Sequence, residues 1–228
     1  MSDQLLSELI DLIPESQRER SGRAFYSGRA AWAKPSRIYL IGYNPGDDGD
    51  AGPGTVMDDA ETILQHDRYS AYVTEGNPVN EPRWGTAMQA SVRHVLGNLG
   101  YDPNLVPASN LFFARSSRAG HHPAELKQRW KEECWPFHEH VIKSLDIEVV
   151  LCIGKDTADF VLSRQAFSNH RPTNTSFTST KGLRRVSQKY DGPGVRVVRL
   201  GHTSSTTWLG VERDPSPYVR DWCANDGQ

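Results

Sequence analysis

Polar side chains follow the apolar runs of this sequence, and two of them are carboxamides. Asn44 stands in a tight loop, Gly-Tyr-Asn-Pro-Gly at residues 42–46, directly after an apolar run at 38–41. Asn110 lies inside a second apolar run. Because a carboxamide is uncharged, Asn44 can hold a water molecule or a polar substrate group but cannot act as a strong base. The chemistry that this residue type predicts is binding and orientation.

Other polar residues occupy the equivalent place after further apolar runs. Arg115, Lys155 and His202 each follow such a run. The carboxyl ends of parallel strands meet at one edge of a sheet, where open α/β sheets bind their ligands. If the runs are parallel strands, these side chains and Asn44 converge on one crevice.

Four short apolar runs, rich in β-branched and aromatic residues, predict the strands that position these groups. The runs are residues 37–43, 105–114, 147–153 and 195–200. Segments with helical spacing alternate with them, at residues 3–13, 85–99, 123–145 and from 156 onward. Strands alternating with helices predict an α/β fold, a three-layer α/β/α sandwich around a central four-stranded parallel sheet.

Three segments lack a regular pattern. Residues 14–36 are polar with several arginines, which is typical of a solvated connection. Residues 44–84 are rich in glycine and proline, and a loop of that length in a compact domain is usually functional or mobile. Residues 164–192 are polar and basic and are compatible with a hairpin.

Length and composition are those of an ordinary globular protein. The chain has 228 residues, of which 37% are hydrophobic and 24% are charged, and it suits one domain over residues 1–228. No apolar run approaches the roughly 20 residues of a membrane span, and the N-terminus lacks the features of a signal peptide. We therefore expect no membrane partner and a cytoplasmic location. The net charge of −2 does not favour a nucleic-acid partner, so a DNA-binding function requires a local basic patch.

The sequence predicts no cofactor and no metal. Its three cysteines, Cys134, Cys152 and Cys223, are too few and too scattered for a disulfide framework or a cysteine-rich metal site. Such sparse cysteine usage fits a reducing compartment. Glycine-rich phosphate loops are absent, which argues against a dinucleotide or nucleoside triphosphate.

Taken in order, the motifs resemble those of the uracil-DNA glycosylase superfamily. The Gly-Tyr-Asn-Pro-Gly loop at 42–46 is similar to the Gly-x-Asn-Pro-Gly motif of the mismatch-specific and single-strand-selective branches. The stretch from Asn110 to Leu162, with Cys-Trp-Pro-Phe at 134–137, resembles the iron-sulfur branch. Gly-His-Thr-Ser at 201–204 stands where the family has His-Pro-Ser. The agreement in order and spacing covers a core of about residues 37–210, and it implies the fold predicted above.

The sequence also departs from this family. Ala114 stands where the iron-sulfur branch has a cysteine, and Cys134 alone cannot hold a cluster that needs a full set of cysteine ligands. Thr203 replaces the proline of His-Pro-Ser. Many relatives insert an apolar wedge into DNA four residues past the histidine, where this chain has Thr206. Trp208 and Leu209 lie close by and are candidates to replace that wedge.

The resemblance implies a monofunctional DNA glycosylase of base excision repair. Such an enzyme hydrolyses the N-glycosidic bond of uracil or a related deaminated base after the base has left the helix stack. By this resemblance His202 donates a hydrogen bond to uracil O2, where negative charge grows in the transition state. Asn44 orients the attacking water. Asn110 reads the uracil edge, because a carboxamide offers a donor and an acceptor to the adjacent O4 and N3–H.

The resemblance also implies contacts to the base and to DNA. Tyr43 lies beside the base and hinders a 5-methyl group, and Trp84 is the candidate to stack on it. The candidates for phosphate contacts are basic and hydroxyl side chains. They are Arg115, Arg118, Lys181, Arg184, Arg185, Ser204 and Ser205. The expected partner is damaged DNA, bound by a monomer.

Structural explanations stand beside these roles. Asn44 could simply form the turn in Asn-Pro-Gly, and His202 could bond to nearby backbone. Trp84 could be a core residue, and clusters of basic residues commonly lie on the solvated surface. Two other functions remain open. One is a non-catalytic or redirected member of the same fold that binds DNA, a nucleobase or a nucleotide. The other is an unrelated α/β enzyme acting on a small molecule.

Overall fold

The structure is a computed structural model, and it describes residues 2–33, 35–46, 54–74, 86–116, 122–178, 185–203 and 207–223. Within these ranges the strands form one six-stranded sheet in the order β2-β1-β3-β6-β5-β4. The strands are β1 (Ile38–Gly42), β2 (Ala108–Asn110), β3 (Val149–Ile153), β4 (Arg171–Thr178), β5 (Arg185–Asp191) and β6 (Arg196–Leu200). The strands β2, β1, β3 and β6 are mutually parallel. The predicted α/β fold class is confirmed.

Both central strands are apolar on both faces because helices cover both sides of the sheet. Every residue of β1 and β3 is buried. The two strands pair in register, with Leu40 opposite Leu151 and Ile41 opposite Cys152. Continuous apolar runs are typical of parallel strands covered in this way. The sequence pattern therefore identified these two strands correctly.

The sheet contains more than the four predicted strands. The polar, basic segment folds into the antiparallel pair β4 and β5, and β5 pairs antiparallel with β6. One such pair places Ser187 opposite Leu200. A hairpin fits here because an antiparallel edge can face water and needs no continuous apolar run.

The second predicted strand, residues 105–114, is much shorter than expected. Only Ala108–Asn110 pairs with β1, after a short 3-10 helix at Pro103–Leu105. Residues 111–114 are apolar and buried but lie outside the sheet. Burial among helices, rather than strand pairing, therefore explains why this half of the run is apolar.

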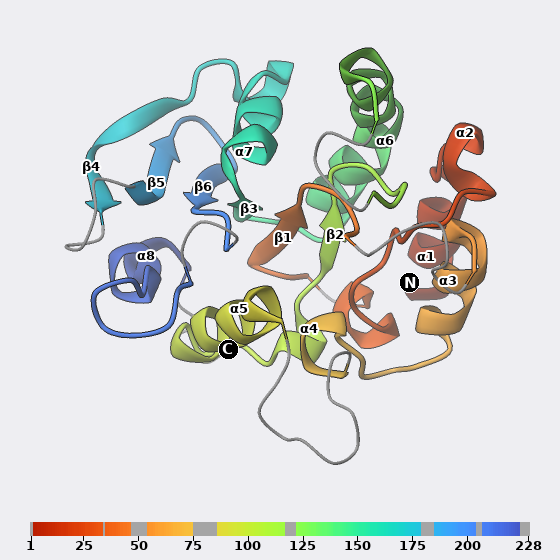
Figure 1. The fold of residues 1–228 in the computed structure, drawn as a ribbon, viewed down its shortest axis with the longest axis horizontal. Coiled ribbons are helices and arrows are strands. Elements are labelled where there is room, and N and C mark those ends of the chain that lie inside the picture. The colour runs from red at the N-terminus through yellow and green to blue at the C-terminus, as the bar shows by residue number, and fades with distance from the viewer. Residues whose placement is uncertain are drawn as a thin grey trace.

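Helices pack in a layer on each face of the sheet (Figure 1). The α-helices are α1 (Ser2–Asp11), α2 (Glu15–Arg18), α3 (Val56–Leu64), α4 (Ala71–Thr74), α5 (Ala87–Asn98), α6 (Ala124–Ser144), α7 (Lys155–Leu162) and α8 (Ser216–Cys223). Two further 3-10 helices span Arg29–Trp32 and Gln165–Phe167. Figure 1 shows α6 and α7 on one side of the sheet, with α5 and α8 on the other. None of the helices within the described ranges is long and apolar enough to cross a membrane.

Alternate strand residues face the two helical layers and form two cores. Tyr39, Ile41 and Val150 pack with residues of α1, α3, α6 and α7. Leu40 and Leu151 face the opposite way and pack with residues of α5 and α8. This alternation follows from the two-residue side-chain period of a strand. The two cores hold the sheet between rigid layers and fix the positions of its strand ends.

Candidate functional site

The candidate residues lie at the carboxyl edge of the parallel strands. Asn110 ends β2 and pairs in register with Gly42, the last residue of β1, so Asn44 follows two residues beyond the same edge. His202 comes two residues after β6, whose last residue Leu200 pairs with the last residue of β3. The structure therefore places Asn44, Asn110 and His202 at one edge of the sheet.

Asn110 holds its carboxamide directly over a glycine. A Cβ added at Gly42 would lie 2.2 Å from Oδ1 of Asn110, so only glycine permits this close approach. Asn110 is 4% exposed, and its Nδ2 is buried without a hydrogen-bond partner among the residues that the structure describes. Buried donors are nearly always paired in native proteins. This amide is therefore a candidate hydrogen-bond donor at the strand end.

Asn44 is oriented by two hydrogen bonds. Its Nδ2 donates to the Pro45 carbonyl at 2.8 Å and to Ser116 Oγ at 2.8 Å. Ser116 lies in the segment that follows β2, so the second bond ties the ends of β1 and β2 together. Because both amide hydrogens are used, the carboxamide presents its oxygen as an acceptor.

His202 packs against a glycine with an unusual backbone. Gly154 has φ +93°, a conformation that favours glycine, and a Cβ there would lie 3.5 Å from Cδ2 of His202. Burial lowers the pKa of His202 below its usual 6.5, and the nearby carboxylate of Asp156 partly opposes that effect. The ring is therefore mainly neutral at pH 7 and carries one N–H donor.

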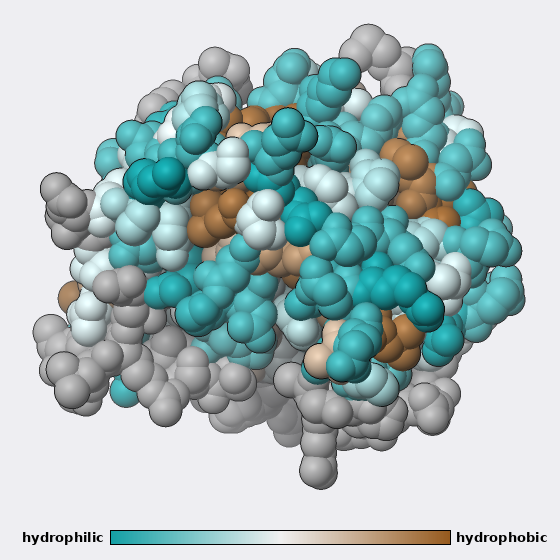
Figure 2. Space-filling model, turned by 90° about the horizontal axis from the view of Figure 1, so that it is seen from above, coloured by the Kyte–Doolittle hydropathy of each residue, from teal (hydrophilic) through white to brown (hydrophobic). Residues whose placement is uncertain are grey.

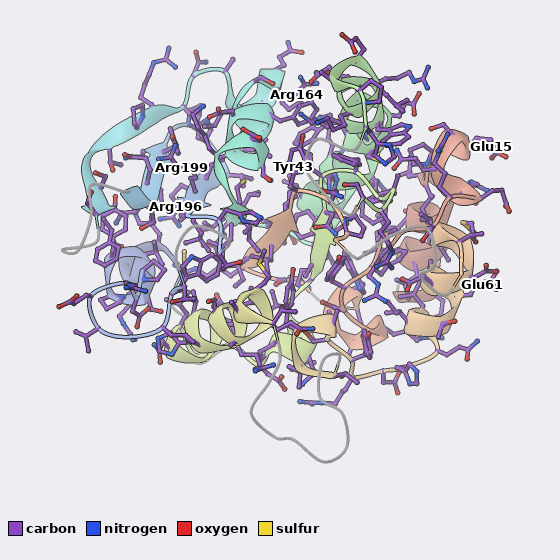
Figure 3. The ribbon with its side chains drawn as sticks, in the orientation of Figure 1. Glu15, Tyr43, Glu61, Arg164, Arg196 and Arg199 are labelled. Atoms are coloured by element: carbon purple, nitrogen blue, oxygen red, sulfur yellow. The ribbon has the colours of Figure 1, made fainter. Side chains whose placement is uncertain are left out.

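Tyr43 lies between α6 and α7 (Figure 3). Its ring meets Phe112 edge to face with centroids 5.3 Å apart, and Nζ of Lys131 lies 5.2 Å from its centroid. Burial raises the pKa of Tyr43, and the charge of Asp156 raises it further. The phenol is therefore neutral near pH 7 and is held in one orientation by its neighbours.

Two charged residues at this site were not predicted. Asp156, in the first turn of α7, influences the pKa of Tyr43, of His202 and of Lys131, and so lies near all three. Lys131 projects from α6 and is half-buried, and burial lowers its pKa. The position of Asp156 just after β3 was a usable signal. The sequence held no comparable signal for Lys131, because helical spacing does not reveal which charged residue faces a neighbouring helix.

Several predicted residues lie outside the described residues. They are Trp84, Arg118, Lys181, Arg184, Ser204 and Ser205, together with Thr206. Arg185 is the first residue of β5, but its side chain is also outside the described part. Arg115 is half-buried, and its guanidinium donates to the Gly46 carbonyl at 3.4 Å.

The two candidates for an apolar wedge differ in exposure. Trp208 is fully buried, and its indole N–H donates to the Gly201 carbonyl at 2.8 Å. It is a core residue beneath the loop that carries His202, and it cannot insert into DNA without leaving the core. Leu209 is 42% exposed and remains the candidate of the pair.

A buried glutamine connects Cys134 with the segment that contains Ala114, the two positions compared above with cysteines of the iron-sulfur branch. Nε2 of Gln17 lies 3.0 Å from Sγ of Cys134, and its Oε1 accepts from the backbone N–H groups of Phe113 and Ala114 at 2.8 and 3.0 Å. Burial raises the pKa of the Cys134 thiol, which favours its protonated form.

Among the described residues no group of three or more His, Cys, Asp or Glu side chains is placed to hold a metal.

The face that carries α6 and α7 is mostly hydrophilic. Figure 2 views the molecule from above and shows polar residues over most of this face, with separate hydrophobic areas between them. Lys131 and Arg164 contribute cations here, and both contact the ring of Phe160, at 5.8 and 4.1 Å from its centroid. Arg164 is also ion-paired with Glu132 on α6, so its charge is partly neutralised within the protein.

Comparisons with known proteins do not identify this chain. A scan against models of protein families matches none of them. A search of curated proteins finds no matching relative. The functional assignment therefore depends on the chemistry and geometry of the residues at the sheet edge.

Proposed function

We propose that the protein is a DNA glycosylase that hydrolyses the N-glycosidic bond of uracil or a related deaminated base. The observation that supports this best is the buried carboxamide of Asn110, whose Nδ2 lacks a partner among the described residues. A donor and an acceptor side by side match O4 and N3–H of uracil, whereas cytosine presents a donor and an acceptor in the opposite order. A single carboxamide can therefore select the deaminated base.

His202 would stabilise the leaving group. When the bond between the sugar C1′ and the base nitrogen breaks, the electron pair moves onto the base and negative charge grows on its carbonyl oxygens. A neutral imidazole, favoured here by the lowered pKa of His202, can donate its N–H to that oxygen. A preorganised donor of this kind acts most strongly in the transition state.

Asn44 would hold the nucleophilic water. The oxygen of its carboxamide can accept from a water molecule, because its Nδ2 is already bonded to Pro45 and Ser116. The water oxygen forms the new bond to C1′, and its proton passes through solvent to the departing base. Since an amide is not a base, the contribution of Asn44 is orientation.

Tyr43 and the basic residues would complete the substrate site. Tyr43 is neutral and held against Phe112, so it can lie beside the base and hinder a 5-methyl group. Trp84 would stack on the base. Phosphates would meet Arg115, Arg118, Lys181, Arg184 and Arg185 with the hydroxyls of Ser204 and Ser205. We propose that this monomer acts on DNA in the cytoplasm.

The test is formation of abasic sites. Single-turnover reactions would use oligonucleotides containing uracil, hypoxanthine, xanthine or no damaged base. We expect cleavage of at least one damaged substrate by the wild type, and loss of that activity in Asn110→Ala. Asn104→Ala is the matched control, because Asn104 is a partly buried asparagine bonded to Asp102 away from the sheet edge. If none of the three bases is released, the proposed activity on uracil and these deaminated bases is ruled out.

A second candidate function is binding of a free nucleobase or nucleotide without cleavage. It is favoured by the carboxylate of Asp156, which lies near Tyr43 and His202, and by the net charge of −2, since both repel the DNA backbone. Calorimetric titration with uracil, deoxyuridine and single-stranded DNA separates the two functions. Binding of the small ligands with no abasic product and no binding of DNA would support this second candidate.

A further inference from the structure

A buried histidine behind the sheet edge has no part in the chemistry proposed above. His138 lies on α6 and is fully buried. Its Nε2 is 3.3 Å from the Leu111 carbonyl, and its Nδ1 is 2.8 Å from the hydroxyl of Tyr39, which is also fully buried. The ring therefore links a strand in the middle of the sheet to the segment that follows Asn110.

The hydrogen bonds fix the tautomer of this ring. A carbonyl oxygen can only accept, so Nε2 must carry the proton that bonds to Leu111. In a neutral imidazole Nδ1 is then an acceptor, and the Tyr39 hydroxyl must donate to it. Burial lowers the pKa of His138 to about 4, so the ring is neutral under ordinary conditions. The Leu111 carbonyl thus sets the tautomer, and Tyr39 stabilises it by donating to Nδ1.

The backbone that receives this bond is the one that aims Asn110. The N–H of Leu111 donates to the Gly42 carbonyl at 2.9 Å, and its C=O accepts from His138. Leu111 is therefore held from both sides, immediately next to Asn110. Beyond Leu111 the chain leaves the sheet, so no strand pairing replaces the bond from His138.

We propose that His138 is a positioning residue for Asn110: its Nε2–H, which donates to the Leu111 carbonyl while Tyr39 donates to Nδ1, fixes the backbone from which Asn110 reads the base. This inference rests on the proposed glycosylase function for its effect on base selection. Its effect on the geometry of Asn110 does not depend on any activity. Small misplacements of a substrate-reading group are expected to reduce the rate strongly.

The test compares two variants of this network with a matched control. His138→Leu removes both ring hydrogen bonds, and Tyr39→Phe removes only the hydroxyl that donates to Nδ1. His170→Leu is the control, because His170 is 6% exposed and bonds to the Val195 carbonyl at 2.7 Å, at the other edge of the sheet. Tyr39→Phe keeps the test interpretable if His138→Leu does not fold.

The first readout is the side-chain amide signals of Asn110 in nitrogen–proton correlation spectra, identified by their loss in Asn110→Asp. We expect these signals to shift in His138→Leu and Tyr39→Phe and to stay in place in His170→Leu. Unchanged Asn110 signals in both network variants would overturn the inference, even if the wild type cleaves no DNA. Absence of cleavage by the wild type would contradict the proposed function and would leave the positioning role of His138 to be judged by the Asn110 signals alone.

The second readout is single-turnover cleavage, corrected for the folded fraction. For His138→Leu we expect a loss of about 10- to 100-fold and a reduced preference for uracil over cytosine, with a smaller loss in Tyr39→Phe. A purely structural role would lower the melting temperature of His138→Leu and His170→Leu alike and leave rate and preference unchanged. That outcome would also overturn the inference.

Discussion

At the scale of single residues, the proposed mechanism assigns Asn44 and His202 to different parts of one transition state. His202 would donate to the departing base, and Asn44 would place water on the sugar. We expect His202→Ala and Asn44→Ala each to slow the cleavage step about 100- to 1,000-fold, the usual cost of losing a preorganised group. DNA affinity should change little, because neither interaction is complete in the ground state. Single-turnover rates and equilibrium binding of the same oligonucleotide measure the two effects. Wild-type rates in both variants would mean that these residues are not catalytic.

Asn110 offers a test of base selection at the same scale. Asn110→Asp replaces the amide donor by an acceptor, which repels uracil O4 and suits the N4 amine of cytosine. The ratio of uracil to cytosine cleavage should therefore fall relative to the wild type. Matched oligonucleotides that differ only in that base provide the measurement. An unchanged ratio would show that Asn110 does not contact this edge of the base.

His138 makes a prediction about stability and pH. Its pKa is about 4 in the folded protein against 6.5 for an ordinary histidine, so the unfolded state binds the extra proton first. The contribution of neutral His138 to the free energy of unfolding is therefore complete above pH 6.5. It declines as pH falls from 6.5 to 4, by about 1 kcal/mol per pH unit. Urea unfolding at pH about 7 and about 5 should show this decline in the wild type and a smaller one in His138→Gln. Equal declines in the two proteins would exclude His138 as the cause.

At the scale of elements, Gln17 and His138 support the segment between Leu111 and Ala114. This segment is buried outside the strands, so side chains complete the hydrogen bonding of those backbone groups that no other backbone group reaches. Gln17→Met would leave the N–H groups of Phe113 and Ala114 without their partner, at a cost of about 1–3 kcal/mol for each buried donor. We expect a clear fall in the free energy of unfolding, measured by urea titration. Gln4→Met is the control, because Gln4 is exposed and its side chain donates to Glu8 on its own helix. A fall no larger than that of the control would contradict this supporting role.

The same elements show what the sequence could and could not predict. The strands β1 and β3 were evident because both their faces are buried, which gives continuous apolar runs. The positions of Asn44 and His202 just past strand ends followed from the apolar runs before them, whereas Asn110 was expected inside its run and instead ends the shorter β2. Residues 14–36 were expected to be solvated, yet Gln17, Phe25 and Trp32 are fully buried there. No local period marks them, because their partners are distant in the chain.

The proximity of the charges at the site could not be predicted from the sequence, for a related reason. Asp156 and Lys131 sit on different helices, and their proximity to Tyr43 depends on how α6 and α7 pack over the sheet. Helical spacing identifies the apolar face of a helix but not the charged residue that borders a neighbouring element. The central parallel sheet was therefore predictable from local patterns, whereas the electrostatics of the site required the tertiary structure.

At the scale of the whole molecule, a net charge of −2 means that DNA binding must come from local basic residues. Lys181 and Arg184 are the proposed phosphate contacts in the segment between β4 and β5. Each phosphate contact releases condensed counterions, so affinity for DNA should fall steeply with salt. Lys181→Ala and Arg184→Ala should each weaken binding to all sequences alike and reduce the slope of log K against log salt by about 1.

Lys143 supplies the control for this prediction. It borders a hollow shared with Glu148 and Arg196, which lie at the amino ends of β3 and β6, opposite the candidate site. Lys143→Ala removes one positive charge, as Lys181→Ala and Arg184→Ala do, but from the side of the molecule opposite the candidate site. The slope of log K against log salt should therefore match that of the wild type. Fluorescence anisotropy of a labelled oligonucleotide over a salt series measures all three variants. If Lys143→Ala lowers the slope as much as the other two, attraction is set by total charge and Lys181 and Arg184 make no specific phosphate contact.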